Sequence, residues 1–353
     1  MNKRKKKKQQ KQQQEASAVQ LDEILKSLFS MSKGVMVTML QSLFNHPIGE
    51  NCQLAEIEIE YNNKEFTKYD YTQVLADMML KVSADKQQKE CYHIEFQTKN
   101  DSTMAIRMFE YGFNMARDEA KYGIGADNTP VKRIVMPRQL VIFVEENSNI
   151  DNFVELLIDF PENQHVSYKV NTFKLWEYSR QDLIDRKLYS LLPIKIFNLR
   201  YELDKINEKL NQLKDDKKDD IELLRAKLDE AVENVKILAQ EISYQSETLF
   251  IGKEINGEDF QRMLLAIGNL CEYLDNRYML SKPIAKEVRK MTQTLYNPEV
   301  ERRGIEKGKE EGLKLAISML RDTGISKEKI VEKLLATWDM TYDKAVEKVN
   351  LYY

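Results

Sequence analysis

Cysteine and histidine are scarce in this chain of 353 residues. Three of each occur, and no Cys-x-x-Cys pair or His-Glu-x-x-His motif is present. An odd number of well-separated cysteines closes no complete disulfide framework, so we expect reduced thiols, a cytoplasmic protein and no structural zinc site. The six residues are Cys52, Cys91, Cys271, His46, His93 and His165.

The sequence also lacks a long apolar run. No segment is long and apolar enough to predict a membrane span, and the basic start is not followed by the apolar core of a signal peptide. We therefore expect a soluble chain without a membrane partner.

Neither sign of charge is in large excess, since 54 lysines and arginines face 57 aspartates and glutamates, for a formal net charge of -3. Contact with nucleic acid would have to come from local patches. The most basic segment, residues 1–17, is rich in lysine and glutamine and is expected to be a disordered tail. It is either an arm for phosphate backbones or a solubilising tail.

Hydrophobic periodicity predicts an α/β region over residues 18–200. Strands are expected at 54–60, 73–82, 91–98, 139–144 and 166–177, the first three as a meander. Helices are expected at 20–45, 102–122 and within 182–199. Gly34 is expected to divide the first helix, and Gly123 and Gly125 to end the second.

The rest of the chain is predicted to be helical. Residues 200–247 contain no glycine or proline and carry an apolar stripe that shifts phase at the charged segment 215–220, which predicts a helical hairpin or a broken coiled coil. Such a segment could join two copies of the chain. One or two helices are expected over 258–296, then a helix stop at Gly324 and helix starts at Ser326 and Thr341. We predict a helical extension over 201–300 and a small helical module over 301–353.

Two acidic residues lie in strand-like segments that follow each other. Alternation places Asp77 on one face of its strand with Met79 and Lys81, and Glu95 on one face of the next with His93 and Gln97. An ionised carboxylate within a sheet is costly unless it is paired or binds a cation. If the two acids share a side, they offer hard oxygen ligands of the kind that Mg²⁺ prefers. The alternative is that each faces solvent.

Several segments, in order, resemble the transposase-associated and recombination-promoting branch of the PD-(D/E)XK nuclease superfamily. They are DEILK (Asp22 to Lys26), LADMMLKV, YHIEFQTKND with MAIRMFEYGFNMA, LYSLLPIKIFNLR and the tail GIEKGKEEG with its GIS-containing helical pair. The resemblance implies a restriction-endonuclease-like core, a small mixed sheet flanked by helices, with an all-helical C-terminal extension.

The resemblance also assigns roles to single residues. Asp77 and Glu95 match the two metal-binding acids, and Gln97 stands where the superfamily motif has lysine. Glutamine can hydrogen-bond the attacking water but brings no charge, so a displaced lysine is a candidate substitute. Supporting residues are the lysines Lys81 and Lys99, the opening pair Asp22 and Lys26, and Arg107 with Tyr111 and Asn114. His93 is either a third ligand or proton shuttle, or a plain surface or hydrogen-bonding histidine.

Two interpretations of Arg107 stay open, because it either clamps phosphate above the acids or pairs with a carboxylate while Tyr111 packs on the sheet. The function implied by the resemblance is Mg²⁺-dependent hydrolysis of DNA phosphodiesters, linked to recombination or transposable elements, in a cytoplasmic or nucleoid-associated protein. The alternatives are a catalytically weak relative that binds DNA or a partner, and a structural coiled-coil protein.

Overall fold

The computed structural model describes most of the chain. It gives the backbone of residues 21, 23–49, 52–61, 74–85, 88–125, 127–147, 149–213, 218–278, 283–295, 298–338 and 340–353. Within these ranges the side chains of 74–77, 85, 88, 218 and 298–308 are not described. The described chain divides into two compact units, Met1–Leu295 and Tyr296–Tyr353. Within the described residues, no helix combines the length and apolar character needed to cross a membrane.

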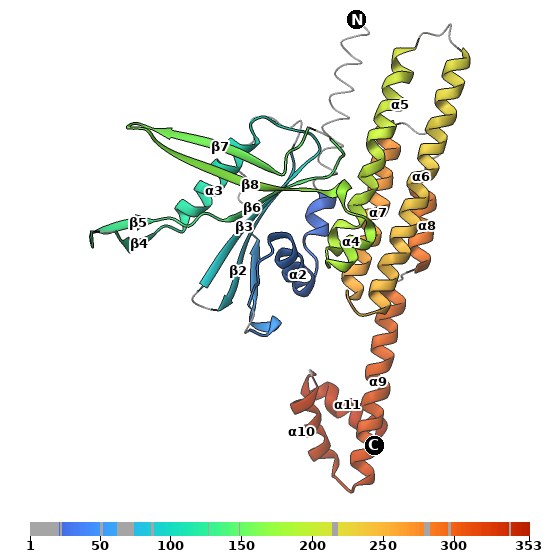
Figure 1. Cartoon of the computed structure of the whole chain (residues 1–353). Coiled ribbons are helices and arrows are strands. Elements are labelled where there is room, and N and C mark those ends of the chain that lie inside the picture. The colour runs from blue at the N-terminus through green and yellow to red at the C-terminus, as the bar shows by residue number, and fades with distance from the viewer. Residues whose placement is uncertain are drawn as a thin grey trace, which may run out of the picture. The chain divides into compact units, whose positions relative to one another are not determined.

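The first unit is built on a mixed six-stranded sheet with strand order β1-β2-β3-β6-β8-β7 (Figure 1). The strands are β1 Glu58–Tyr61, β2 Val74–Asp85, β3 Gln88–Gln97, β6 Arg138–Phe143, β7 Phe153–Phe160 and β8 Gln164–Lys174. The first three form an antiparallel meander, β6 runs parallel to β3 and to β8, and β7 pairs antiparallel with β8. The expected mixed α/β architecture is confirmed.

Strand β3 is buried on both faces, and its alternation decides what each face carries. Tyr92 and Phe96 lie on one face, where their rings pack 5.1 Å from Phe44 and 4.6 Å from Phe29. Phe44 ends helix α2 (Lys33–Phe44), so a helical layer covers this side. The other face is covered by α3 (Met104–Asp118), whose apolar residues pack on β6 and β8.

Several predicted boundaries are wrong. The first helix divides at residues 29–32 and not at Gly34, which lies in the first turn of α2. The segment 54–60 begins with a single 3-10 turn, Leu54–Glu56, before β1. Helix α3 ends at Asp118, because the chain turns there into β4 (Lys121–Ile124), which contains Gly123. Neither β4, β5 (Pro130–Arg133) nor β7 was expected.

The segment after β8 consists of short turns of helix, of which those within 182–199 were expected, whereas 175–177 had been predicted as strand. They are η2 Leu175–Glu177, α4 Arg180–Asp185, η3 Tyr189–Leu191 and η4 Pro193–Leu199. Four longer helices follow, α5 Arg200–Gln212, α6 Lys218–Ile251, α7 Gly257–Tyr278 and α8 Ala285–Leu295. Helices α5 and α6 lie side by side as the predicted hairpin (Figure 1).

These helices belong to the same compact unit as the sheet. The domain boundary predicted at residue 200 stays a prediction. Ion pairing joins them, since Arg200 Nη1 lies 2.7 Å from the Glu145 carboxylate just beyond β6. The stripe residues Leu203, Val235 and Ile242 are buried within the chain. Their packing is intramolecular, and assembly of two copies through 201–247 stays a prediction.

The second unit is a three-helix module of α9 Pro298–Asp322, α10 Lys327–Thr337 and α11 Tyr342–Tyr352. Its core joins Leu313 and Ile317 of α9 to apolar side chains of the two shorter helices. Gly324 follows α9 with φ 78°, and Ser326 and Thr341 are the N-caps of α10 and α11. The predicted stop and starts of these helices are confirmed.

Candidate functional site

Strands β2 and β3 place the two predicted acidic residues directly opposite each other. The antiparallel register pairs Asp77 with Glu95 and Met79 with His93. Positions that face each other across an antiparallel pair lie on the same face of the sheet. The backbone thus brings the two acidic positions together on one face, which the sequence had left open. The side chain of Asp77 lies outside the described residues, and the distance between the carboxylates stays a prediction.

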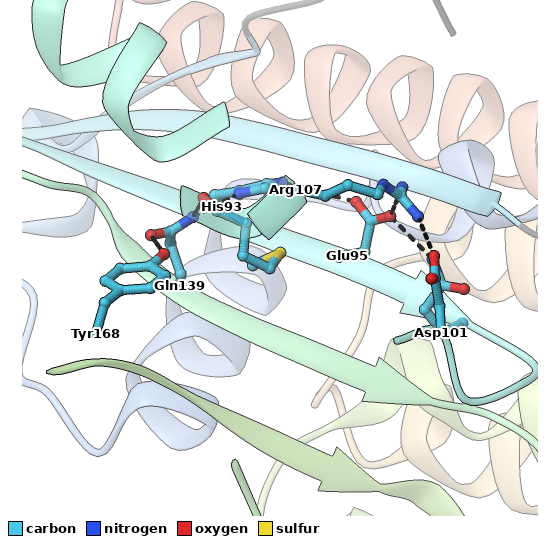
Figure 2. A network of polar contacts seen from close by, with 8 residues as sticks. His93, Glu95, Asp101, Arg107, Gln139 and Tyr168 are labelled. Atoms are coloured by element: carbon cyan, nitrogen blue, oxygen red, sulfur yellow. Dashed lines mark hydrogen bonds and ion pairs between the residues drawn. The ribbon is translucent and has the colours of Figure 1, made fainter. Parts of the chain in front are cut away.

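Glu95 is fully buried under α3 and has three polar neighbours, two of which, Arg107 and His93, are seen in Figure 2. Its Oε1 accepts a hydrogen bond of 2.9 Å from Gln97 Nε2 and an ion-paired hydrogen bond from Arg107 Nη2. Its Oε2 lies 3.7 Å from His93 Nε2. Among the described residues, neither Glu95 Oε2 nor Gln97 Oε1 accepts a hydrogen bond. A buried carboxylate with one unsatisfied oxygen is costly, which marks this position as one with a function to perform.

Arg107 reaches Glu95 from the first turns of α3 and is held from its other side by Asp101. The Asp101 carboxylate accepts from Arg107 Nη1 at 3.1 Å and from the backbone of Thr103 at 2.8 Å. Burial alone would raise the pKa of Asp101, but the hydrogen bonds from Thr103 and Arg107 outweigh it and lower that pKa. Burial likewise opposes the charge on Arg107, and the attraction of Glu95 outweighs it, so the Arg107 pKa is raised.

Of the two interpretations left open, the structure has Arg107 paired with carboxylates. Its guanidinium carbon lies 5.9 Å from the centre of the Tyr111 ring, one turn along α3. The His93 ring lies 5.9 Å from the same Tyr111 ring, edge to face. Tyr111 thus packs against the site from the helix.

A second polar group fixes the orientation of His93. Gln139, at the start of β6, donates from Nε2 to the Met108 carbonyl at 2.6 Å and to His93 Nδ1 at 3.0 Å, and its Oε1 accepts from the Tyr168 hydroxyl. An amide nitrogen can only donate, so His93 Nδ1 must be the acceptor. In neutral His93 the proton is therefore on Nε2, the nitrogen that lies toward Glu95 (Figure 2).

Close packing of α3 on Gln139 requires Gly112. A Cβ added at Gly112 would lie 2.7 Å from Gln139 Oε1 and 2.8 Å from its Nε2. Such a separation is too short for any side chain, so Gln139 would have to leave its position. The glycine in the middle of an amphipathic helix was the one sequence signal that could have pointed to this contact.

The remaining predicted residues lie farther from Glu95. Lys81 is four positions from Asp77, roughly 13 Å at about 3.3 Å per residue, and is ion-paired with Glu119. The role of Lys81 as a substitute for the motif lysine stays a prediction. Lys99 lies beyond the end of β3 and is exposed. Lys26 is exposed on the segment before Phe29, whose ring packs on the opposite face of β3. Asp22 lies outside the described residues.

The oxygen atoms at this site fit a hard cation. Glu95 Oε2 and Gln97 Oε1 are buried, belong to the ligand types that Mg²⁺ prefers and accept no hydrogen bond within the described chain. Among the side chains that the structure describes, no group of three or more His, Cys, Asp or Glu is arranged to hold a metal ion, and Asp77 is not among those side chains.

Comparisons with known proteins identify no relative of this chain. No protein-family model, curated protein or solved structure matches the chain. Function is therefore argued from the chemistry of the residues around Glu95, because a fold alone does not specify one. Sequence reasoning missed Asp101, Gln139 and Tyr168, which reach the site only through the tertiary fold.

Proposed function

We propose that this chain is a Mg²⁺-dependent DNA endonuclease of the PD-(D/E)XK type, associated with recombination or transposable elements. The observation that carries the proposal is the register that pairs Asp77 with Glu95 on neighbouring strands, with Gln97 two residues further along β3. The sheet with helices on both faces agrees with the small mixed sheet that the resemblance implies.

Asp77, Glu95 and the Oε1 of Gln97 would hold the cation. Bound there, Mg²⁺ supplies polarisation of the phosphodiester and lowers the pKa of the attacking water. Gln97 Nε2 orients the Glu95 carboxylate by donating to Oε1, which leaves Oε2 directed away from that bond. His93 Nε2 lies 3.7 Å from the same oxygen, which is beyond hydrogen-bond reach and leaves that oxygen without a donor among the described residues.

Arg107 supplies the positive charge that Gln97 lacks. Its guanidinium already contacts Glu95 and Asp101, and it is about one-sixth exposed, at 17% for the side chain. A planar guanidinium binds phosphate oxygens as well as it binds carboxylate. In the proposed reaction Arg107 exchanges Glu95 for the scissile phosphate and stabilises charge that develops on it.

The proposal is tested by cleavage of supercoiled DNA with and without Mg²⁺. Wild type is expected to nick or linearise the DNA only with the metal, and Asp77→Asn and Glu95→Gln are each expected to lower the rate at least about a hundredfold, as losing a preorganised charged group does. Asp159→Asn, an exposed acid on β7, is the matched control and should cleave like wild type. Equal cleavage by all four proteins would contradict the proposal.

A second function, DNA binding without catalysis, is favoured by the complete burial of Glu95 and its ion pair with Arg107. An arginine at that position competes with a metal ion for the carboxylate. In this case wild type and Glu95→Gln bind DNA equally and neither cleaves it. Binding that weakens steeply with salt would separate this function from a purely structural helical protein.

A further inference from the structure

A small two-stranded ribbon stands apart from the six-stranded sheet. Strands β4 and β5 pair only with each other in the described chain and follow α3 directly (Figure 1). Their register pairs Tyr122 with Lys132 and Lys121 with Arg133. An isolated two-stranded hairpin is marginally stable at best in water. The apolar side chains of this ribbon therefore do not serve to form a hydrophobic core.

The ribbon exposes the large apolar side chains that a core would bury. Tyr122 is 81% exposed and Ile124 is 78% exposed, and both lie on the same face because they are two residues apart on one strand. Val135, just after β5, is 71% exposed. Apolar groups grouped at one projecting element are typical of a contact surface.

The ribbon also carries a repulsion between basic side chains. Lys121 and Arg133 are both exposed and directly opposite each other, and like charges in that arrangement destabilise a strand pair. Lys132 lies 5.9 Å from the centre of the Tyr122 ring, on the face that carries Ile124. In the part of the chain that the structure describes, Lys121 and Arg133 form no ion pair with a carboxylate. A polyanion bound to the ribbon would relieve the repulsion.

We propose that the β4–β5 ribbon docks in the major groove of double-stranded DNA. A two-stranded ribbon is one of the elements that this groove admits. The face that carries Tyr122, Ile124 and Lys132 lies toward the base edges. The long side chains of Lys121 and Arg133 extend past the strand edges to the phosphates that flank the groove, and Lys132 contacts a phosphate from the inward face. The proposal rests on the proposed function in that it takes DNA as the substrate, and it names the surface that holds the duplex.

Other occupants fit the ribbon less well. A second copy that packed ribbon against ribbon would gather two sets of the basic residues Lys121, Lys132 and Arg133 in one interface. A lipid surface would have to accept the Asp127 carboxylate at the turn of the ribbon, where its Oδ1 holds Thr129, and moving that charge out of water is costly. In a DNA groove this turn stays hydrated.

Binding of a short duplex by the full chain, without metal and over a range of salt, tests the proposal. In the triple variant Lys121→Gln/Lys132→Gln/Arg133→Gln the slope of log K against log salt should fall by about two to three, because each phosphate that the protein neutralises adds about 0.9 to that slope. Tyr122→Ala should weaken binding several-fold with the slope unchanged. The control Lys209→Gln/Arg225→Gln/Lys227→Gln removes three exposed basic residues of α5 and α6 and should bind like wild type. The basic tail is common to all variants.

The outcomes separate the ribbon from the nuclease proposal. If wild type binds or cleaves duplex DNA and the ribbon triple variant binds as tightly as the control variant, the ribbon proposal fails and the nuclease proposal stands. If wild type neither binds nor cleaves, both fail. Loss of binding to single-stranded DNA or to anionic vesicles, with duplex binding retained, would also overturn the ribbon assignment. Circular dichroism confirms that each variant is folded.

Discussion

Strand β3 buries apolar side chains on one face and polar side chains on the other, and the two faces are stabilised differently. Phe96 and Glu95 are adjacent, and each has 0% of its surface exposed. Phe96 stabilises the folded chain because its ring leaves water and packs on Phe29. Glu95 loses hydration, and its burial is tolerated only because Arg107, Gln97 and His93 surround it. The polar face is therefore retained at a cost to stability, as expected of a functional site.

The largest expected effect is on the apolar face. Phe96→Ala should lower the free energy of unfolding by about 3–5 kcal/mol, because the packed ring leaves a cavity. The loss should be independent of salt and pH, since no charge is involved. Urea unfolding at two ionic strengths checks this. A loss below about 1 kcal/mol would mean that the face does not stabilise the core.

Removing the guanidinium on the polar face should lower the free energy of unfolding by a similar amount, and a second substitution should restore it. Arg107→Met leaves Glu95 as an unpaired buried charge and should cost about 3–5 kcal/mol. Adding Glu95→Gln should restore most of that stability, because the double variant buries no unpaired charge. A double-mutant cycle by urea unfolding gives the coupling. Additive losses would show that the pair does not interact as described.

Lys195 is a buried lysine that forms no ion pair with a carboxylate among the described residues, so its stability contribution depends on pH. Its Nζ donates to the carbonyls of Leu175 and Tyr178, and burial, with the nearby Arg180, lowers its pKa from 10.5 to about 8. Between those values the unfolded chain holds a proton that the folded chain has released. Stability contributed by this group therefore rises with pH across that window.

The shift in the Lys195 pKa corresponds to about 3 kcal/mol over the whole window, at about 1.4 kcal/mol for each pH unit. Unfolding of wild type and Lys195→Met is measured at about pH 7.5 and about pH 10.5. The stability of wild type relative to the variant should increase at the higher pH. Parallel pH profiles for the two proteins would contradict this interpretation.

Gly112→Ala should destabilise the chain although alanine favours helices. Displacement of Gln139 breaks its bonds to His93, Met108 and Tyr168, at an expected cost of about 1–3 kcal/mol. Gly312→Ala in α9 is the matched control, since its added Cβ would meet Trp338 at an ordinary 3.6 Å and should gain up to about 1 kcal/mol. Changes of the same sign would contradict the packing of α3 on Gln139.

The smallest effect is expected for Tyr168→Phe, which removes one hydrogen bond and should cost about 1 kcal/mol. Gln139 can still donate to His93, so the proton should stay on His93 Nε2.

Gln139→Glu, which offers an acceptor instead, should move that proton to Nδ1. Nitrogen-15 shifts of the three histidine rings report the tautomer directly. An unchanged tautomer in Gln139→Glu would show that Gln139 does not set it.

Local pattern was sufficient for much of this site. Alternation predicted two strands of the β1–β3 meander, and a continuous apolar run predicted the buried β6, because both patterns depend on neighbours in sequence. That Asp77 and Glu95 stand opposite each other was left open, because the cross-strand register decides it. Gln139 and Tyr168 could not be predicted, since Gln139 reaches His93 from a strand 46 residues away in sequence, and Tyr168 reaches Gln139 from a strand 29 residues further along. The ribbon was missed because its exposed apolar residues look like an ordinary loop or a continuing helix.

Titration of Mg²⁺ into the metal-free protein by calorimetry tests the acid pair most directly. One site is predicted in wild type and in Asp159→Asn, and none in Asp77→Asn or in Glu95→Gln. Binding that survives in both variants of the pair, or no binding in wild type, would show that the opposed positions on β2 and β3 do not form a cation site.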